Sequence, residues 1–492
     1  MMTKKRLLEI VPGFISWNII LFLFWGGYFF PIFTAYFILA FDVYWIYSGL
    51  SLTIAVVMAH LKIRAYEHVD WLLEARGFGD WKKVRHIVMI MVANEPVEVY
   101  RKTIEALAKQ TFPLKQIAVV IATEGHSPKG ADEAEKLRGT FGHKFGAYLV
   151  TVHPDKIPGE IKGKSSNEAW AAQEAKKILV DQKKWDLRYL TITSNDADAI
   201  LDSQYFACLT FKFLDDPARY ERFWQPAIVY YNNIWKIPAL TRVVNSFGNI
   251  WQTGLMTRKD RLINFSNYSA SLLMIDRVGY WDTDVIPEDY RIFFKAFFAL
   301  AGRVEVEPIF LMSSADAPQS TSTWKTFIND YRQKQRWAWG VSDLPLFIEM
   351  YFKKPNLSFL NKTVRILRVI KDHVLWPVNW FVITVGVIIV TLINPAFGRT
   401  SLGYSLPRLS SGLLSITLVF LLVLVIVEYR QRPSGQLHLS RWRKFLSPLE
   451  FILMPIAGFF FSALPGLDAH TRLMLGRYLE YRVTEKLENI PK

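Results

Sequence analysis

Five long stretches without a charged residue constrain the fold of this chain more than any other feature. They run from Ile10 to Phe41, Val43 to His60, Val374 to Gly398, Leu409 to Val427 and Phe451 to Leu467. A helix needs about 20 mostly apolar residues to cross the core of a bilayer. The first stretch is longer than one such helix and contains Pro31, so the sequence predicts two crossings before residue 62, near 13–30 and 33–60. Asp42 falls within the second crossing, where we expect it to lie near an interface or to face other helices.

The start of the chain is not typical of a cleavable signal peptide. Lys4, Lys5 and Arg6 suit the basic region of such a peptide, but the apolar run that follows is too long and a second span comes after it. We therefore expect a retained membrane anchor and a cell membrane location.

The net charge of +15 raises the question of nucleic-acid binding. Many of the positive residues flank the apolar stretches, as in Lys353 to Lys371 and Arg430 to Lys444. Such clusters are typical of cytoplasmic flanks and of contact with anionic membrane lipids. Since no basic-aromatic module is present, we expect no nucleic-acid partner. The single cysteine, Cys208, excludes a disulfide framework and a cysteine-rich metal site.

Residues 63–340 have the pattern of a soluble α/β domain. Buried strands are expected at 86–93, 116–122, 148–152 and 189–193, and helices at 96–110 and 167–180. Continuous apolar runs of this kind favour parallel strands covered on both faces, as in a doubly wound, Rossmann-like sheet. In such sheets ligands bind beyond the carboxyl ends of the strands. These ends carry the polar residues Asn94, Glu95, Glu124, Asp196 and Asp198.

The expected organisation has five parts. Residues 1–62 form two transmembrane helices, 63–340 the cytosolic domain, 341–372 amphipathic and basic interface helices, 373–467 two to three transmembrane or re-entrant helices, and 468–492 the tail. Pro448, Pro455 and Pro465 leave open whether 446–467 crosses the membrane, and a cytoplasmic tail is expected if it does not.

Asp196-Ala197-Asp198 is a D-x-D motif that follows a predicted buried strand. Its carboxylates can bind a hard divalent cation, Mg²⁺ or Mn²⁺, which would neutralise a leaving nucleotide diphosphate. The alternative is an ordinary turn or helix cap, since a bare D-x-D is common by chance. Glu288-Asp289 has a similar alternative, an N-cap. In the functional interpretation Asp289 is the general base for an acceptor hydroxyl, with Glu288 beside it.

A third motif, Q-x-x-R-W, begins at Gln333. On a helix Gln333, Arg336 and Trp337 share one face. Arg336 can bind a diphosphate through two hydrogen bonds, and Trp337 offers a flat surface to an acceptor sugar. The turn from Lys164 to Asn167 precedes a helix, so Lys164 or the helix N-terminus can meet a phosphate. A surface lysine turn is the alternative.

Taken together, these motifs resemble glycosyltransferase family 2, the inverting GT-A enzymes, and in particular the membrane-integrated β-glycan synthases. The resemblance covers about residues 85–340 and the general plan of spans on both sides. It is carried by Asn94-Glu95, Lys164 to Asn167, the D-x-D, Glu288-Asp289 and Q-x-x-R-W. Two positions depart from the family pattern. Only Glu124 stands where the family has paired aspartates for the nucleobase, and Pro287 replaces a threonine.

The resemblance implies a membrane-embedded hexosyltransferase with a cytosolic GT-A domain. It would move a sugar from a UDP- or GDP-sugar to a glycan acceptor, with inversion, and a processive β-polysaccharide synthase is one form of this activity. One alternative is transfer of a single sugar to a lipid-linked or polyprenyl-phosphate acceptor. An alternative of another class is a transporter or receptor that binds a nucleotide-sugar without catalysis.

Overall fold

The computed structural model describes residues 4–125, 127–260, 262–433, 442 and 446–480. Most of the predicted basic loop 429–444, and the part of the predicted tail from residue 481 onward, therefore lie outside the described residues. Within the described ranges, five helical stretches are long and apolar enough to cross a membrane, in agreement with the predicted upper number of spans.

The membrane-type helices are longer than the sequence indicated. They are α1 (Lys4–Phe29), α2 (Pro31–Glu67), α13 and α14 (Phe359–Trp380 and Gly386–Ile393, joined by the π-helical turn Phe381–Val385), α16 (Ser401–Gln431) and a final stretch from Ser447 to Leu475. That final stretch consists of η8 (Ser447–Leu453), α18 (Met454–Gly458), η9 (Phe459–Ala463) and α19 (Leu464–Leu475).

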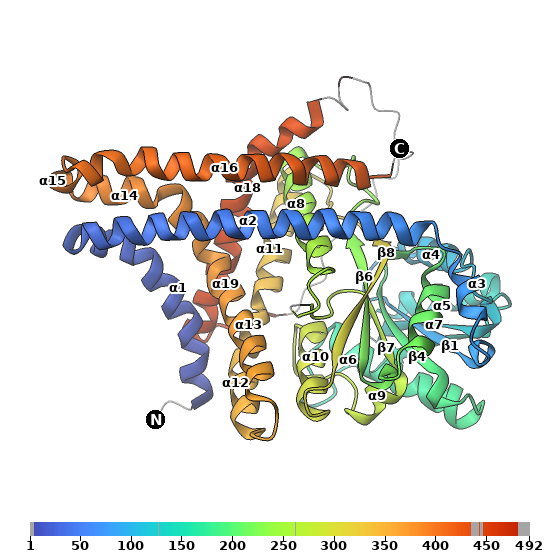
Figure 1. Cartoon of the computed structure of the whole chain (residues 1–492). Coiled ribbons are helices and arrows are strands. Elements are labelled where there is room, and N and C mark those ends of the chain that lie inside the picture. The colour runs from blue at the N-terminus through green and yellow to red at the C-terminus, as the bar shows by residue number, and fades with distance from the viewer. Residues whose placement is uncertain (1–3, 126, 261, 434–441, 443–445, 481–492) are drawn as a thin grey trace.

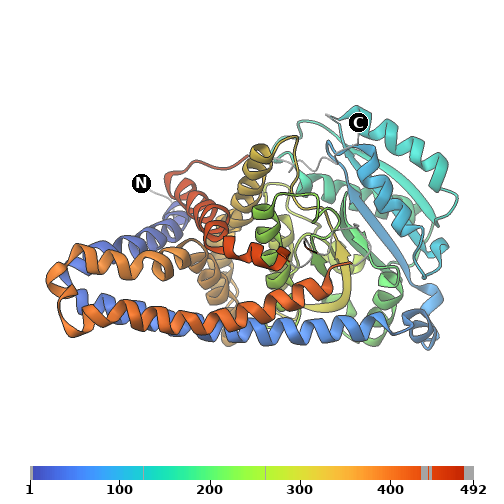
Figure 2. The ribbon, with the colours of Figure 1, turned by 90° about the horizontal axis from the view of Figure 1, so that it is seen from above.

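Helix α2 connects the membrane-type helices to the α/β domain. With 37 residues it extends about 55 Å, well beyond the ~30 Å core of a bilayer. It lies beside α16 over much of its length and then continues along the α/β domain (Figures 1 and 2). Asp42 is fully buried between the two helices and accepts a hydrogen bond from Ser410 Oγ at 2.7 Å. Asp42 therefore faces another helix, as one of the two predictions had it.

The α/β domain is built on a mixed sheet of eight strands in the order β3-β2-β1-β4-β7-β6-β8-β5. The strands are β1 (Arg85–Met91), β2 (Ile117–Glu124), β3 (Ala147–His153), β4 (Leu190–Asp196), β5 (Ile200–Leu201), β6 (Arg222–Val229), β7 (Tyr268–Ser271) and β8 (Glu305–Ser314). Strands β1 to β4 are parallel, as predicted. The other half of the sheet is mixed, since β7 runs antiparallel to both β4 and β6.

The first two predicted strands form because their apolar runs are buried on both faces. In β1 the side chains of Val88 and Ile90 pack in one core with α4 (Val97–Leu107), α5 (Pro128–Phe141) and α7 (Tyr205–Asp215). Ile87 and Met89 point to the opposite face, toward α6 (Lys164–Lys176), α9 (Leu272–Arg277) and α10 (Glu288–Ala299). This alternation is the two-residue period of a strand covered by helices on both sides.

Three further helices link this domain to the membrane-type helices. Helix α8 (Ala239–Leu255) packs against α2 and α16, α11 (Thr323–Ala338) packs against α19, and α12 (Leu344–Lys353) packs against α1 and α13. Several basic residues at the start of α13 contact protein here. Arg365 lies over the rings of Phe293 and Phe297, and Arg368 pairs with Asp260. The interpretation of this cluster as a lipid-facing flank therefore needs correction for these two residues.

Candidate active site

The D-x-D motif lies at the carboxyl end of β4, where the sheet changes from parallel to mixed. The backbone N–H of Asp196 donates to Asn267 Oδ1 at 2.8 Å, which fixes the end of β4 against the loop before β7. Asp198 Oδ2 accepts from the backbone N–H of Asp316 at 2.7 Å, and the Asp198 carbonyl accepts from Asn232 Nδ2 at 3.1 Å. Neighbouring segments thus hold the backbone of Asp196 and the carboxylate of Asp198 in place.

Lys164, in the first turn of α6, joins two of the predicted motifs. Its ammonium lies 2.9 Å from Asp196 Oδ1 and 3.0 Å from Glu288 Oε1, and it donates to the Ser266 carbonyl at 3.1 Å. Burial acts to lower the pKa of Lys164, but the attraction of Asp196 and Glu288 outweighs it and holds that pKa well above the usual range. Lys164 is therefore a largely buried, charged bridge between the D-x-D and Glu288-Asp289.

Asp289 lies in the first turn of α10, and two backbone N–H groups hold its carboxylate. Ser266 N–H donates to its Oδ2 at 2.7 Å, and Tyr290 N–H donates to its Oδ1 at 2.7 Å. Asn264 Nδ2 donates to the Asp289 carbonyl at 2.8 Å. Glu288 is buried, and burial raises its pKa although Lys164 opposes the shift. The two neighbouring acids thus differ in setting, with Glu288 tied to the lysine and Asp289 to the backbone.

Two residues that the sequence analysis did not single out complete this cluster. Ser266 uses its carbonyl for Lys164, its N–H for Asp289 and its hydroxyl for Asp196 Oδ2, at 2.7 Å in the last case. Its φ of 53° lies in the left-handed region, which is uncommon for residues other than glycine. Glu168 is fully buried one turn after Lys164, and burial raises its pKa to about 8. The spacing of four residues from Lys164 was a signal for Glu168, whereas nothing in the residue type marked Ser266.

A second group of predicted residues lies at the ends of β1 and β2. Asn167 Nδ2 donates to the Ala122 carbonyl in β2 at 3.0 Å, and Glu95 Oε2 accepts from Ala93 N–H at 2.7 Å in the loop that also holds Asn94. Glu124 is buried, and its burial raises its pKa to about 7, with Lys162 opposing and Glu95 adding to the shift. Glu124 and Glu95 are therefore close enough to interact.

The Q-x-x-R-W residues lie on α11. The Trp337 ring stacks on Tyr230 with centroids 6.1 Å apart, and the ammonium of Lys334 stands 3.7 Å from the centre of the indole. Gln333 is buried next to Lys334, and Arg336 is partly buried on the same helix. Tyr230 is two residues from Asn232, which bonds Asp198. Trp337 and Asp198 of the D-x-D thus contact the same segment, which follows β6.

The donor atoms at the D-x-D fit a hard cation, because Asp196 and Asp198 both present carboxylates. Within the described ranges, no group of three or more His, Cys, Asp or Glu side chains could hold a metal ion. A Mg²⁺ or Mn²⁺ ion at the motif would therefore need further oxygen ligands from a diphosphate or from water.

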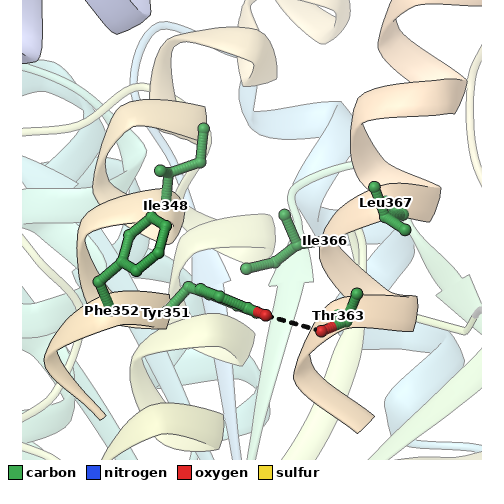
Figure 3. A pocket seen from close by; sticks show the side chains of 6 residues that line it. All are labelled: Ile348, Tyr351, Phe352, Thr363, Ile366 and Leu367. Atoms are coloured by element: carbon green, nitrogen blue, oxygen red, sulfur yellow. Dashed lines mark hydrogen bonds between the residues drawn. The ribbon is translucent and has the colours of Figure 1, made fainter. Parts of the chain in front are cut away.

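An apolar hollow of about 200 Å³ lies elsewhere, between α12 and α13 (Figure 3). Its lining consists of Ile348, Tyr351, Phe352, Thr363, Ile366 and Leu367, with Tyr351 OH and Thr363 Oγ1 2.8 Å apart. None of the predicted site residues lines it, so this hollow is separate from the candidate active site.

Comparison with known proteins bears on the family. The family model described as glycosyl transferase family group 2 matches residues 191–428, just under half of the chain. The matched segment contains the D-x-D, Glu288-Asp289 and Q-x-x-R-W, and it begins after Asn94, Glu124 and Lys164. No curated protein matches the chain.

Solved structures show a weaker likeness. The mannosyltransferase PcManGT from Pyrobaculum calidifontis, in complex with GDP-Man and Mn²⁺, has a TM-score of 0.43 at 12% identity, over 86% of this chain and 97% of that one. S. aureus TarS 1-349, in complex with UDP-GlcNAc, has a TM-score of 0.36 at 12% identity, over 81% and 93%. These values are below 0.5, so the assignment rests on the family model together with the mixed α/β sheet and its flanking apolar helices. Residues 191–428 match glycosyl transferase family group 2, in agreement with the predicted family, and the mixed α/β sheet with its flanking apolar helices agrees with the predicted fold class.

Proposed function

We propose that the chain is a membrane-embedded, inverting hexosyltransferase that moves a sugar from a UDP- or GDP-sugar to a hydroxyl of a glycan acceptor. The observation that carries this proposal is the joining of two motifs by one residue. Ser266 bonds Asp196 of the D-x-D through its hydroxyl and Asp289 through its N–H. A leaving-group site and a base thus lie side by side, as transfer of a sugar between them requires.

In this proposal Asp289 is the base. It takes the proton of the acceptor hydroxyl as the acceptor oxygen attacks the anomeric carbon from the side opposite the diphosphate. The new glycosidic bond forms, the bond from the anomeric carbon to the phosphate oxygen breaks, and the nucleoside diphosphate leaves with the electron pair. The hydrogen bonds from Ser266 and Tyr290 orient the Asp289 carboxylate for this proton transfer.

The remaining residues act on the donor. A Mg²⁺ or Mn²⁺ ion held by Asp196 and Asp198 would supply positive charge to the leaving diphosphate. Arg336 adds a guanidinium that can bind a phosphate through two hydrogen bonds. Glu124, with Asn94, Glu95 and Asn167 nearby, stands at the strand ends where the nucleobase and ribose would bind. Trp337 offers its indole to the acceptor.

The orientation of the chain belongs to the same proposal. The long helices α2 and α16 carry their charged ends, Arg64 to Glu67 and Glu428 to Arg432, toward the α/β domain. Positive residues next to a span favour the cytoplasmic side. The α/β domain would therefore face the cytoplasm, where nucleotide-sugars are available to it, and the spans would lie in the cell membrane.

A screen of nucleotide-sugars tests this function. Membranes that contain the chain are incubated with each UDP- or GDP-sugar and Mn²⁺, and release of the nucleoside diphosphate is measured against membranes that contain Asp198→Ala. Release with at least one donor, and only in the unaltered chain, is the expected result. Equal release in both preparations, or none, would reject the transferase and favour a nucleotide-sugar-binding receptor.

The length of the product separates the two kinds of transferase. A labelled donor that yields a ladder of long products indicates a processive synthase. A single labelled species that partitions into organic solvent indicates transfer of one sugar to a lipid-linked acceptor instead.

A further inference from the structure

We propose that Lys164 is an internal competitor of the divalent cation at the D-x-D motif. In this proposal its ammonium neutralises Asp196 while the donor site is empty, and it must leave Asp196, while keeping Glu288, before a metal ion can bind there. The inference rests on the proposed function in one respect, namely that the D-x-D binds a metal.

All three hydrogen-bond donors of the Lys164 ammonium are occupied in this structure. An ammonium has three donors, and the three are directed to Asp196 Oδ1 at 2.9 Å, Glu288 Oε1 at 3.0 Å and the Ser266 carbonyl at 3.1 Å. A phosphate or any other new partner can reach this ammonium only if one of the three contacts breaks. The predicted role of Lys164 in donor binding therefore requires an exchange of partners.

Exposure indicates which contact breaks. The side chain of Asp196 is 29% exposed, whereas those of Glu288 and Lys164 are 9% and 10% exposed. Water and a solvated cation can reach Asp196, and they cannot easily reach Glu288. The contact between Lys164 and Asp196 is thus the one that an incoming cation would replace.

Asp196 is held in position independently of the lysine. Its Oδ2 accepts the Ser266 hydroxyl at 2.7 Å and its backbone N–H bonds Asn267. The carboxylate therefore keeps its place when the ammonium leaves, so that the site for the cation does not have to be rebuilt.

The surplus of acid around the lysine gives the exchange its driving force. Asp196, Glu288, Glu168 and Asp289 all interact electrostatically with this one ammonium. Even with Glu168 protonated, one positive charge cannot neutralise the three remaining carboxyl groups, so the cluster attracts a second cation. That cation can take over Asp196 while Lys164 continues to neutralise the buried acids.

Direct measurement of Mn²⁺ binding tests the competition without any sugar transfer. The full chain in detergent is titrated with Mn²⁺ and free Mn²⁺ is followed by electron paramagnetic resonance, for wild type, Lys164→Gln and Lys162→Gln. We expect Lys164→Gln to bind Mn²⁺ more tightly by on the order of tenfold, because a partly buried competing ion pair is removed. Lys162→Gln removes the same charge from an exposed neighbour and should change the affinity less than about threefold.

Two further variants keep the test decisive. Lys164→Arg retains the positive charge and should bind Mn²⁺ no more tightly than wild type. It also controls for damage to the fold caused by the loss of lysine itself. Glu288→Gln should weaken Mn²⁺ binding, because the ammonium then pairs with Asp196 alone, and this effect should vanish in the Lys164→Gln background. Such a loss of additivity is the signature of two residues that act through each other.

The outcomes separate this inference from the proposed function. Unchanged or weaker Mn²⁺ binding in Lys164→Gln would overturn the competition, as would an equal effect of Glu288→Gln in both backgrounds. Absence of Mn²⁺ binding in every variant, with UDP or GDP present, would overturn it as well. Tighter binding in Lys164→Gln, together with no transfer from any donor, would support the competition and reject the transferase.

Discussion

Two buried ionic clusters in this molecule have similar chemistry and different balance. The catalytic cluster, so named for the role proposed above, consists of Lys164, Asp196, Glu288, Asp289 and Glu168. The joint cluster, where the α/β domain meets the membrane-type helices, consists of Glu428 and Arg432 with Tyr231, Ser246 and Asn249. Each cluster buries charged groups, which costs stability. The difference in charge balance indicates which of the two clusters suits the binding of a ligand.

The joint cluster is balanced and closed. Glu428, near the end of α16, accepts from Tyr231 OH at 2.9 Å and from Asn249 Nδ2 at 3.2 Å, and it lies 3.5 Å from Arg432. Arg432 Nη2 donates to Ser246 Oγ at 2.7 Å. The two charged side chains are 1% and 3% exposed. One acid meets one base, and polar groups of the α/β domain surround them.

The catalytic cluster has several acids for one base and is open at Asp196. A surplus of buried negative charge costs stability, whereas a charge paired with its opposite costs less. The balanced cluster therefore suits a joint that holds two parts of a protein together. The unbalanced cluster suits a site whose charge is completed by something that binds, which is the role proposed for it above.

The largest expected effect comes from the catalytic cluster. Asp289→Asn preserves the shape of the side chain but cannot accept the acceptor proton, so transfer should fall by ~10²–10⁴-fold while donor binding persists. Transfer rates and donor dissociation constants check this. Asp284→Asn is the matched control, since Asp284 is an exposed acid shortly before α10. Full activity of Asp289→Asn would move the role of base to another residue.

The next effect concerns the stability of the joint cluster. Arg432→Met leaves Glu428 buried without its cation, and loss of one partner of a buried pair costs about 3–5 kcal/mol. We expect a large fall in the unfolding temperature, and most of it should be regained in the double variant with Glu428→Gln. A double variant as unstable as Arg432→Met alone would show that the two residues do not act as a pair.

The parallel half of the sheet was predictable from the sequence, because burial of a strand leaves a local apolar signal. Strands β1 and β2 are buried on both faces, so each is a nearly continuous apolar run, and β2 and β4 end in the acids Glu124 and Asp196. Strands β5 and β7 have two and four residues, and β7 reads Tyr-Ser-Ala-Ser, so neither has a local apolar signal. Strand β6 is broken by a change of register at Pro226.

The missing parts of the site are those that depend on distant contacts. The left-handed Ser266 and the bridge from Lys164 to Asp196 exist only because α6, β4 and the loop before β7 meet in space. The same holds for Arg365 and Arg368, whose charge suggested a lipid-facing flank and whose contacts are with Phe293, Phe297 and Asp260. The position of a basic residue in the sequence does not show whether its side chain faces lipid or protein. The roles assigned to all of the candidate site residues stay predictions.

A smaller effect is expected at Trp337, which stacks on Tyr230, the neighbour in sequence of Tyr231 in the joint cluster. Trp337→Ala removes a stack on Tyr230 and a cation–π contact with Lys334, together worth about 1–3 kcal/mol of stability. If Trp337 also contacts the acceptor, the acceptor KM rises while the donor KM does not. Trp324→Ala is the control, because Trp324 is 72% exposed on the same helix. Equal results for the two variants would remove Trp337 from the acceptor site.

The effect expected at Glu124 depends on pH and vanishes at acidic pH. Burial raises the pKa of Glu124 from 4.5 to about 7, so the fold favours its protonated form. The stability that this preference contributes is fully present below pH 4.5 and is lost as the pH rises through 7. Glutamine is neutral throughout. We therefore expect Glu124→Gln to match the wild type near pH 4.5 and to become the more stable protein as the pH rises, by at most about 1.4 kcal/mol per pH unit, with a plateau above pH 7.

Unfolding temperatures and donor affinities measured from pH 5 to 8 check this last expectation. A neutral Glu124 can donate a hydrogen bond to a nucleobase carbonyl and an ionised one cannot. Donor affinity of the wild type should therefore weaken as the pH rises past 7, while that of Glu124→Gln stays level. Glu105→Gln, on the exposed side of α4, should stay within about 0.5 kcal/mol of the wild type across the range. A stability difference for Glu124→Gln that does not vary with pH would mean that this carboxyl stays ionised in the fold, and its place opposite the nucleobase would then have to be filled by an acceptor of hydrogen bonds.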